Sequence, residues 1–364
     1  MRIALGILLA SLLFFSPAVL CGGAETIVPV VNRDYLPVLL ELIASARTSI
    51  DFIQLEFHYD PQVKKVQDAL REAVGRGVAV RGLIEDKISF NRTSEGYLNR
   101  FGIETRLDTP RKQLHNKLFV ADRRRVLLGS TNLSANSMDN NNETNVLVES
   151  PAVGEFFARY FEQLWKNSEA EPVLEAVEIP GAATVVNRGH FPVLEKMIAG
   201  ARQRVWVMVY GMNYSRSYPD SKANALIDAL ILAAGKGLDV RVILDLSDYN
   251  QGLNRLNRET AELLKKGGVD VRFDREDVTT HAKLVLADQT ALVGSANWGY
   301  QALEVRNESS LMITDPAAVA FFGDYFTEIW NGRIYPPPTP VPAGPAATPS
   351  PAPEPTPPRP CPGK

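Results

Sequence analysis

Cysteine is scarce in this chain of 364 residues, which contains only Cys21 and Cys361. The first lies in an apolar N-terminal segment and the second in a C-terminal tail, so the long segment between them has none. That segment can therefore hold neither a disulfide framework nor a zinc site built from cysteine ligands. A folded body without cysteine tolerates an oxidising compartment, which is compatible with export.

The chain also lacks a large excess of charge of either sign. It contains 39 Lys and Arg against 42 Asp and Glu, giving a net charge of −3 and a pI near 5.9. This balance disfavours avid non-specific binding of nucleic acid through bulk charge. Two short basic clusters, Arg111–Lys112 and Arg123–Arg125, could still supply a local basic groove. A hydrophobic share of 45% is enough to bury a substantial core.

Apolar runs are short, and the one that stands out lies near the N-terminus. Arg2 precedes an apolar stretch from Ile3 to Phe15, which small and helix-breaking residues then follow. The stretch is short for a membrane span, so we assign residues 1–24 to a signal peptide and expect a secreted or periplasmic protein. A lipoprotein anchor through Cys21 is a weaker alternative, because Leu20 stands where a lipobox normally has a small residue. The cleavage site is left open.

What the chain does contain is an internal duplication. His115 and His281 lie 281 − 115 = 166 residues apart, and several short segments recur at similar spacing. A repeat of this length is the size of a domain. The recurring segments are Val31-Asn32-Arg33 with Val186-Asn187-Arg188, and Pro37-Val38-Leu39 with Pro192-Val193-Leu194.

The duplication divides the chain into four parts. The signal peptide is followed by a first half, residues 25–170, and a second half, residues 171–334. Residues 167–183 have little periodicity and are predicted to be a connector. Residues 335–364 are rich in Pro, Ala, Thr and Ser, so we expect an extended or disordered tail.

Each half alternates helical and strand patterns. Apolar residues recur at helical spacing from Val38 to Ala46 and from Val63 to Val74, and Gly75 and Gly77 mark the end of the second helix. This alternation predicts the α/β class, with two homologous α/β/α sandwich halves that contain mixed β-sheets. The predicted strands are Ile50–Tyr59, Val78–Ile84, Ile103–Arg106, Val205–Tyr210 and Leu238–Leu244, and a short helix is predicted at Tyr97–Phe101.

The most informative pattern is a His-x-Lys-x4-Asp motif that occurs once in each half. The first copy comprises His115, Lys117 and Asp122, and the second comprises His281, Lys283 and Asp288. Each copy is followed by a Gly-Ser-x-Asn segment and then by an Asn-Glu pair. The later segments contain Ser130, Asn132 and Glu143 in the first half, and Ser295, Asn297 and Glu308 in the second.

The spacing within the motif predicts how its side chains are presented. The stretch from each histidine to its aspartate alternates and is apolar, which indicates a strand. Side chains two apart on a strand point to the same face, so His115 and Lys117 should project together, as should His281 and Lys283. The glycines of the Gly-Ser-x-Asn segments permit a tight turn or a close backbone approach beside them.

Paired imidazoles and ammonium groups suit displacement at the phosphorus of a phosphodiester. Two lysines and several neutral donors can stabilise the charge on the equatorial oxygens without a metal. One imidazole can attack phosphorus to form a phosphohistidine, while the other protonates the leaving alkoxide and then activates water or an alcohol. The two histidines should titrate as a coupled pair. His58 and His190 lack this context, and we treat them as non-catalytic.

Acidic residues of the motifs divide into two groups. A buried acid that accepts a hydrogen bond from each imidazole would fix its tautomer, and Glu143 and Glu308 are the candidates for this role. Asp122 and Asp288 belong to the motif and are grouped with the catalytic residues. They sit several residues along their strands, however, so a structural role is the alternative.

These paired motifs resemble the HKD signature of the phospholipase D superfamily, from about Ile27 to Trp330. The resemblance implies two halves related by a pseudo-twofold axis, with both motifs in one shared active site. It implies that His115 is the nucleophile and that His281 is the general acid and then the base. Since one chain supplies both motifs, a monomer is expected. The resemblance also implies phosphate binding by Lys117, Lys283, Asn132 and Asn297, with Ser130 and Ser295 beside them.

We expect neither a metal ion nor another cofactor. Glu85, Asp86 and Asp245 end predicted strands and could reach the cleft, but no cluster of His, Asp and Glu with the spacing of metal ligands stands out. A phosphohistidine mechanism needs no metal.

The resemblance leaves the substrate open, because the superfamily includes phospholipases, cardiolipin synthases, endonucleases and phosphatidyltransferases. We favour a phospholipid at a membrane surface, hydrolysed or transferred to an alcohol, because of the expected export, the two fused motifs and the near-neutral charge. The alternative is an exported endonuclease acting on DNA or RNA, if Arg111–Lys112 and Arg123–Arg125 flank the cleft. Intact histidines and lysines argue against a non-catalytic scaffold. Headgroup preference stays open.

Overall fold

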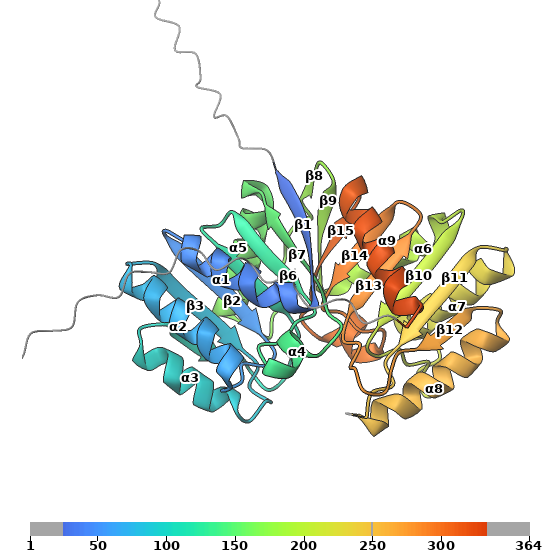
Figure 1. The fold of residues 1–364 in the computed structure, drawn as a ribbon, viewed down its shortest axis with the longest axis horizontal. Coiled ribbons are helices and arrows are strands. Elements are labelled where there is room, and N and C mark those ends of the chain that lie inside the picture. The colour runs from blue at the N-terminus through green and yellow to red at the C-terminus, as the bar shows by residue number, and fades with distance from the viewer. Residues whose placement is uncertain (1–24, 249, 333–364) are drawn as a thin grey trace, which may run out of the picture.

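Two mixed β-sheets, each with helices against it, form the described part of the chain (Figure 1). The computed structural model describes residues 25–248 and 250–332. The predicted signal peptide (1–24), the predicted tail (335–364), Cys21 and Cys361 lie outside the described residues. This arrangement confirms the α/β class with two sandwich-like halves.

The first sheet has seven strands in the order β1-β7-β6-β5-β2-β3-β4. Strands β2, β3 and β4 are parallel to one another, and the other neighbours are antiparallel, so the sheet is mixed as predicted. The strands are β1 (Thr26–Val31), β2 (Ser49–Gln54), β3 (Ala79–Ile84), β4 (Glu104–Leu107), β5 (Lys117–Ala121), β6 (Arg125–Gly129) and β7 (Thr144–Glu149). The helices are α1 (Tyr35–Ser45), α2 (Pro61–Gly75), α3 (Asn91–Arg100), α4 (Ala135–Asp139) and α5 (Pro151–Lys166).

The second sheet repeats this pattern and adds one short edge strand, in the order β12-β11-β10-β13-β14-β15-β9-β8. Its strands are β8 (Glu178–Ile179), β9 (Ala182–Val186), β10 (Arg204–Val209), β11 (Asp239–Leu244), β12 (Asp270–Phe273), β13 (Lys283–Ala287), β14 (Thr290–Gly294) and β15 (Ser309–Ile313). Its helices are α6 (His190–Gly200), α7 (Lys222–Gly235), α8 (Gln251–Lys266) and α9 (Pro316–Trp330).

The hydrophobic core has three parts, and one of them joins the halves. Each half has its own cluster between the sheet and its outer helices, which lie at opposite flanks in Figure 1. The third cluster lies between the two sheets and includes apolar side chains of both, together with α5 and α9. Buried aromatic residues dominate this shared cluster, among them Phe157, Phe161, Phe322, Phe326 and Trp330.

Local sequence signals explain how the helices begin and end. A polar residue followed by proline starts α2, α5 and α9, and the side chains of Asp60, Ser150 and Asp315 accept hydrogen bonds from the first-turn N–H groups. Gly77 after α2 and Gly237 after α7 have φ of +88° and +84°, which favours glycine at these helix ends. Among the described residues, the structure contains no helix that is both long and apolar enough to span a membrane.

Several of the predicted boundaries were wrong. Strand β2 ends at Gln54 rather than Tyr59, because the residues beyond it leave the sheet to form one wall of a cleft. Helix α3 begins at Asn91, six residues before the predicted start. Strand β5 begins at Lys117, so His115 precedes the strand. The predicted connector at 167–183 contains β8 and the first residues of β9.

Candidate active site

Both motif histidines lie where the two halves meet, immediately before central strands of the sheets. His115 precedes β5 and His281 precedes β13. The backbone N–H of His115 donates to the carbonyl of Asn307 at 2.9 Å, and that of His281 donates to the carbonyl of Asn142 at 2.9 Å. Each histidine is therefore fixed at its backbone by the opposite half of the chain.

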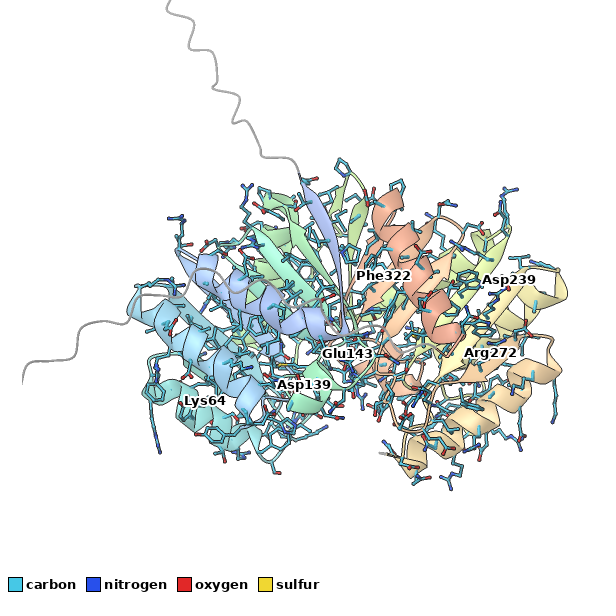
Figure 2. All side chains as sticks on the ribbon, in the orientation of Figure 1. Lys64, Asp139, Glu143, Asp239, Arg272 and Phe322 are labelled. Atoms are coloured by element: carbon cyan, nitrogen blue, oxygen red, sulfur yellow. The ribbon has the colours of Figure 1, made fainter. Side chains whose placement is uncertain are left out.

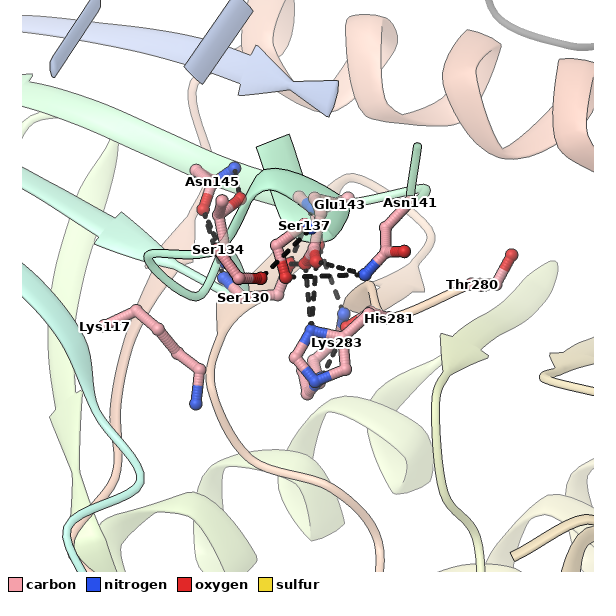
Figure 3. A network of polar contacts seen from close by, with 12 residues as sticks. Lys117, Ser130, Ser134, Ser137, Asn141, Glu143, Asn145, Thr280, His281 and Lys283 are labelled. Atoms are coloured by element: carbon pink, nitrogen blue, oxygen red, sulfur yellow. Dashed lines mark hydrogen bonds and ion pairs between the residues drawn. The ribbon is translucent and has the colours of Figure 1, made fainter. Parts of the chain in front are cut away.

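Each imidazole is also oriented by a glutamate from the opposite half. His115 Nδ1 lies 2.9 Å from Glu308 Oε2, and His281 Nδ1 lies 3.1 Å from both carboxylate oxygens of Glu143. Glu143 lies at the junction of the halves, as Figure 2 shows, and Figure 3 shows its contact with His281. The sequence identified the two glutamates as candidates for this role. It did not indicate that each glutamate contacts the histidine of the other half, which we call the exchange of partners.

The serines of the Gly-Ser-x-Asn segments hold these glutamates. Ser130 Oγ donates to Glu143 at 2.5 Å, and Ser295 Oγ donates to Glu308 at 2.5 Å. Both serines are fully buried, and neither lines the cleft beside the histidines. The geometry therefore corrects the predicted contact with phosphate: the two hydroxyl groups fix the carboxylates that orient the imidazoles.

The motif lysines are buried behind their histidines. Lys117 Nζ donates to the carbonyl of His115 at 2.7 Å, and Lys283 Nζ donates in the same way to the carbonyl of His281. Burial lowers the pKa of Lys117 to about 8 and that of Lys283 to about 7. Neither lysine is among the residues that line the cleft, so their binding of phosphate stays a prediction. Two buried ammonium groups of this kind would be stabilised by an anion bound nearby.

The two histidine–glutamate pairs differ electrostatically. Burial, together with several nearby cations, lowers the pKa of His115 well below its usual value, and burial raises the pKa of Glu308. Burial also lowers the pKa of His281, but Glu143 opposes that shift. Burial acts to raise the pKa of Glu143, but His281, Lys283 and the hydroxyl group of Ser130 together outweigh burial, so this pKa is lowered. Of the two pairs, His281–Glu143 has the stronger tendency to hold a proton on the imidazole.

A cleft of about 880 Å³ opens onto both histidines. The amide side chains of Asn132 and Asn297 line it, as the prediction of phosphate-binding residues requires. Asn297 Oδ1 accepts a hydrogen bond from the backbone N–H of Gly211 at 3.3 Å, which fixes the orientation of this amide. Close packing explains the glycine of each Gly-Ser-x-Asn segment, since a Cβ at Gly129 would overlap Asn145 and one at Gly294 would overlap Ser310.

Asp122 and Asp288 lie far from the cleft, at the opposite ends of their strands. The five-residue strands β5 and β13, each roughly 17 Å long, separate these aspartates from the histidines. Asp122 accepts hydrogen bonds from the backbone N–H groups of residues 47–49, and Asp288 accepts from those of residues 202–204. This geometry corrects their grouping with the catalytic residues: they tie the strand ends to the preceding loops.

Buried carboxyl pairs anchor the two loops that carry the histidines. Glu85 Oε2 accepts from the N–H of Leu114 at 2.7 Å, and Asp245 Oδ1 accepts from the N–H of Thr280 at 2.9 Å. The sequence indicated that Glu85 and Asp245 could reach the cleft, but it did not indicate their partners, Asp108 and Asp274. A recurrence in the sequence could have identified these two aspartates. Asp108 and Asp274 each lie seven residues before the motif histidine of their half (115 − 108 = 281 − 274 = 7).

Neither predicted basic cluster forms a groove at the cleft. Each of these five side chains forms an ion pair with a glutamate, and none of them lines the cleft. The pairs are Arg111–Glu169, Lys112–Glu171, Arg123–Glu155, Arg124–Glu149 and Arg125–Glu41.

The other two histidines differ from each other in their surroundings. His190 is buried, with Nδ1 at 2.9 Å from the carbonyl of Asn187 and Nε2 at 2.6 Å from Ser310 Oγ, so it has a structural role. His58 lines the cleft beside Glu56. Within residues 25–248 and 250–332, no three side chains of His, Cys, Asp or Glu are grouped so that they could hold a metal ion.

Residues 39–165 and 194–330 both match the family described as "Cardiolipin synthase, PLD-like domain". The two matches together cover well over half of the chain, and each contains one histidine–lysine motif. The chain therefore belongs to this family, which places it in the phospholipase D superfamily.

Similar proteins include enzymes named for phospholipids. The human mitochondrial cardiolipin hydrolase is 30% identical over 129 residues, which are 35% of this chain and 50% of that protein, so the chain spans about half its length. Cardiolipin synthase B of Salmonella typhimurium is 26% identical over 342 residues, covering 81% of this chain and 78% of that protein. The structure of phosphatidylserine synthase from Haemophilus influenzae shares the fold, with a TM-score of 0.63 at 14% identity over 84% of this chain and 86% of that one.

Proposed function

We propose that this protein is a phosphodiesterase of the phospholipase D type that acts on phospholipids. It either hydrolyses the phosphodiester or transfers the phosphatidyl group to an alcohol. The observation that carries this proposal is the pair of imidazoles at one cleft, each held by a buried glutamate and each backed by a buried lysine. Such a site offers a nucleophile, a proton donor and two cations to a single phosphate group.

In the first step, Nε2 of His115 attacks phosphorus while the bond to the leaving alcohol breaks and His281 donates its proton to the departing oxygen. In the second step, His281 removes a proton from water or an acceptor alcohol, the new oxygen bonds to phosphorus, and the phosphorus–nitrogen bond to His115 breaks. The glutamates hold the Nδ1 atoms, which leaves Nε2 of each ring for these steps.

The electrostatic difference between the pairs supports this division of roles. A nucleophile must be neutral, and the pKa of His115 is lowered well below its usual value. A general acid must carry a proton; burial lowers the pKa of His281 as well, but the anionic Glu143 opposes that shift and favours the charged form. The same assignment was implied by the family resemblance.

Two observations support a phospholipid over a nucleic acid as the substrate. The similar proteins described above include a cardiolipin hydrolase and a cardiolipin synthase. In addition, none of the five side chains of the two basic clusters lines the cleft, and each is paired with a glutamate, which disfavours them as a track for a polyanionic backbone.

Product analysis on phospholipid vesicles tests the proposal. The wild type and His115→Ala are incubated with ethanol and EDTA, and the lipids are separated by mass. We expect phosphatidic acid or phosphatidylethanol from the wild type and a loss of at least about 10²-fold in the variant, because the nucleophile is gone. Circular dichroism of both proteins checks that the variant is folded.

The alternative outcome is equally specific. If the wild type yields no lipid product but degrades DNA or RNA in EDTA, the phospholipid proposal is wrong and the protein is an endonuclease.

We further propose export of this enzyme to the cell surface, periplasm or medium, on the basis of residues 1–24. Mass spectrometry of the protein recovered from each fraction would identify its N-terminus. A start between residues 19 and 25 is expected. A lipid-modified Cys21 would support the anchor instead, and an intact N-terminus in the cytoplasm would contradict export.

A further inference from the structure

The two sides of the cleft differ chemically, although the halves that form them are repeats. Asn132 and Asn297 occupy equivalent positions in the Gly-Ser-x-Asn segments. The residue after each forms an isolated β-bridge, with Phe57 in the first half and with Met212 in the second. Phe57 and Met212 are therefore equivalent, and so are the residues before them, Glu56 and Gly211.

Glu56 places a carboxylate in the cleft, close to the cationic groups of the site. Its side chain lines the cleft and is 23% exposed, and Oε2 lies 3.3 Å from Nε2 of His58. Despite burial, the hydrogen bond to His58 and the charges of Lys117 and His281 hold the pKa of Glu56 below its usual value. The carboxylate is therefore ionised close to the histidine that handles the proton of the alcohol.

The second half has no acid at the matching position, and several apolar side chains line the cleft near it. Gly211 cannot be replaced without displacing Leu253, whose Cδ1 would lie 3.0 Å from a new Cβ. Beside it, the ring of Tyr210 packs edge-on against His281 with centroids 4.9 Å apart. Other apolar residues that line this side of the cleft are Met212, Leu256, Trp298 and Ala302.

A fixed carboxylate beside a phosphate site repels the phosphodiester unless it meets a positive or proton-donating group. Asp60, the other acid that lines the cleft, caps α2 and accepts from the N–H of Ala135, so its oxygens already have partners. Glu56 has one partner, His58, among the described residues, which leaves acceptor capacity toward the cleft.

We infer that Glu56 selects the alcohol portion of the substrate by accepting a hydrogen bond from its hydroxyl or ammonium group. This inference rests on the proposed function, because it places the alcohol beside His281. Glu56 is then the feature of this site that distinguishes a glycerol-like or ethanolamine-like alcohol from one without a donor. The same contact would hold an acceptor alcohol that takes the place of the leaving one.

Three lipids that differ only in the alcohol provide the test: phosphatidylglycerol with hydroxyl groups, phosphatidylethanolamine with an ammonium group, and phosphatidylmethanol with neither. Each is presented at the same fraction in phosphatidylcholine vesicles, and kcat/KM is measured for each. Glu56→Met removes the acceptor, Glu56→Gln removes the charge alone, and Glu104→Gln on the exposed edge of β4 is the matched control.

We expect Glu56→Met to reduce the preference for both donor lipids over phosphatidylmethanol by about tenfold or more, as the loss of one hydrogen bond to a charged group predicts. Glu56→Gln should reduce the ethanolamine preference more than the glycerol preference, because an amide oxygen still accepts from a hydroxyl. Glu104→Gln should keep the wild-type ratios. The lipid with the larger loss identifies which donor the carboxylate prefers.

Two further outcomes would contradict the inference, and they distinguish its failure from the failure of the proposed function. If both Glu56 variants lose activity by the same factor on all three lipids, Glu56 only balances the charge of Lys117 and His281, and the inference is wrong. If the wild type turns over none of the three lipids and cuts nucleic acid, the proposed function fails and this inference fails with it.

Discussion

The buried carboxylates of Glu308 and Glu143 set the orientation and tautomer of the two motif histidines. Glu308 and Glu143 each fix one imidazole, and each is in turn fixed by a serine hydroxyl. We expect Glu308→Gln and Glu143→Gln to lower kcat by about 10²-fold or more, because an amide can stabilise the wrong tautomer and cannot stabilise an imidazolium. Lipid turnover of folded variants measures the effect. Wild-type kcat in either variant would exclude an orienting role for that glutamate.

The lowered pKa values of the two motif lysines predict how the reaction rate depends on pH. Burial lowers their pKa to about 8 for Lys117 and about 7 for Lys283, so both lose positive charge as the pH rises through this range. A phosphodiester stays anionic throughout. We therefore expect kcat/KM to fall on the alkaline side of about pH 7 to 8, as measured on zwitterionic vesicles whose own charge is constant. A profile that stays level to pH 10 would show that the lysines remain charged in the free enzyme.

The loops before the histidines depend on carboxyl groups that must keep a proton. Burial, then the charge of Glu85, raises the pKa of Asp108 to about 8 from an ordinary value of 3.8. The folded state therefore binds this proton more tightly than the unfolded state does. Its contribution to stability is fully present below about pH 3.8 and is lost as the pH rises through about 8.

Asp108→Asn should remove much of this dependence, since an amide cannot ionise. Urea unfolding at pH 5, 7 and 9 would measure it, and the wild type should lose more stability between pH 5 and 9 than the variant. Asp274→Asn, at the equivalent place in the second half, should behave similarly, because burial raises the pKa of Asp274 to about 7. Parallel pH profiles for wild type and variants would contradict the assignment.

Local patterns predicted the elements well and their limits less well. The β-α-β order and the helix end at Gly77 were confirmed because they depend on near neighbours in the chain. The residues after Gln54 continue the apolar pattern of a strand, yet they leave the sheet to line the cleft, which only tertiary contacts decide. Asp122 was misassigned because it shares a motif with His115, although an extended strand separates the two.

The partner exchange between glutamates and histidines lay outside sequence reasoning for a related reason. Glu143 is 28 residues from His115 but binds His281, which is 138 residues away. Spacing alone favours the nearer pair, and the true pairing follows from how the halves dock. The same holds for Glu56, whose importance depends on facing a cleft that both halves build.

At the scale of the whole molecule, the shared core predicts that the halves unfold together. Phe322 of α9 is fully buried in the cluster between the sheets. We expect Phe322→Ala to destabilise the protein by about 3–5 kcal/mol and to leave a single urea transition, coincident by tryptophan fluorescence and circular dichroism. Phe52→Ala, in the separate core of the first half, is the comparison. Two transitions in either variant would show that the halves fold independently.

The exchange of glutamates also has a consequence for how such a chain can change over generations. A substitution at Glu143 is felt by the histidine of the other copy, and one at Glu308 by the histidine of the first copy. Duplicated segments often diverge in function. Here neither half can lose its glutamate without affecting the histidine of the other half. The ancestral repeat is thus preserved by mutual dependence, and the differences that do accumulate should gather where the halves are free to diverge, on the walls of the cleft.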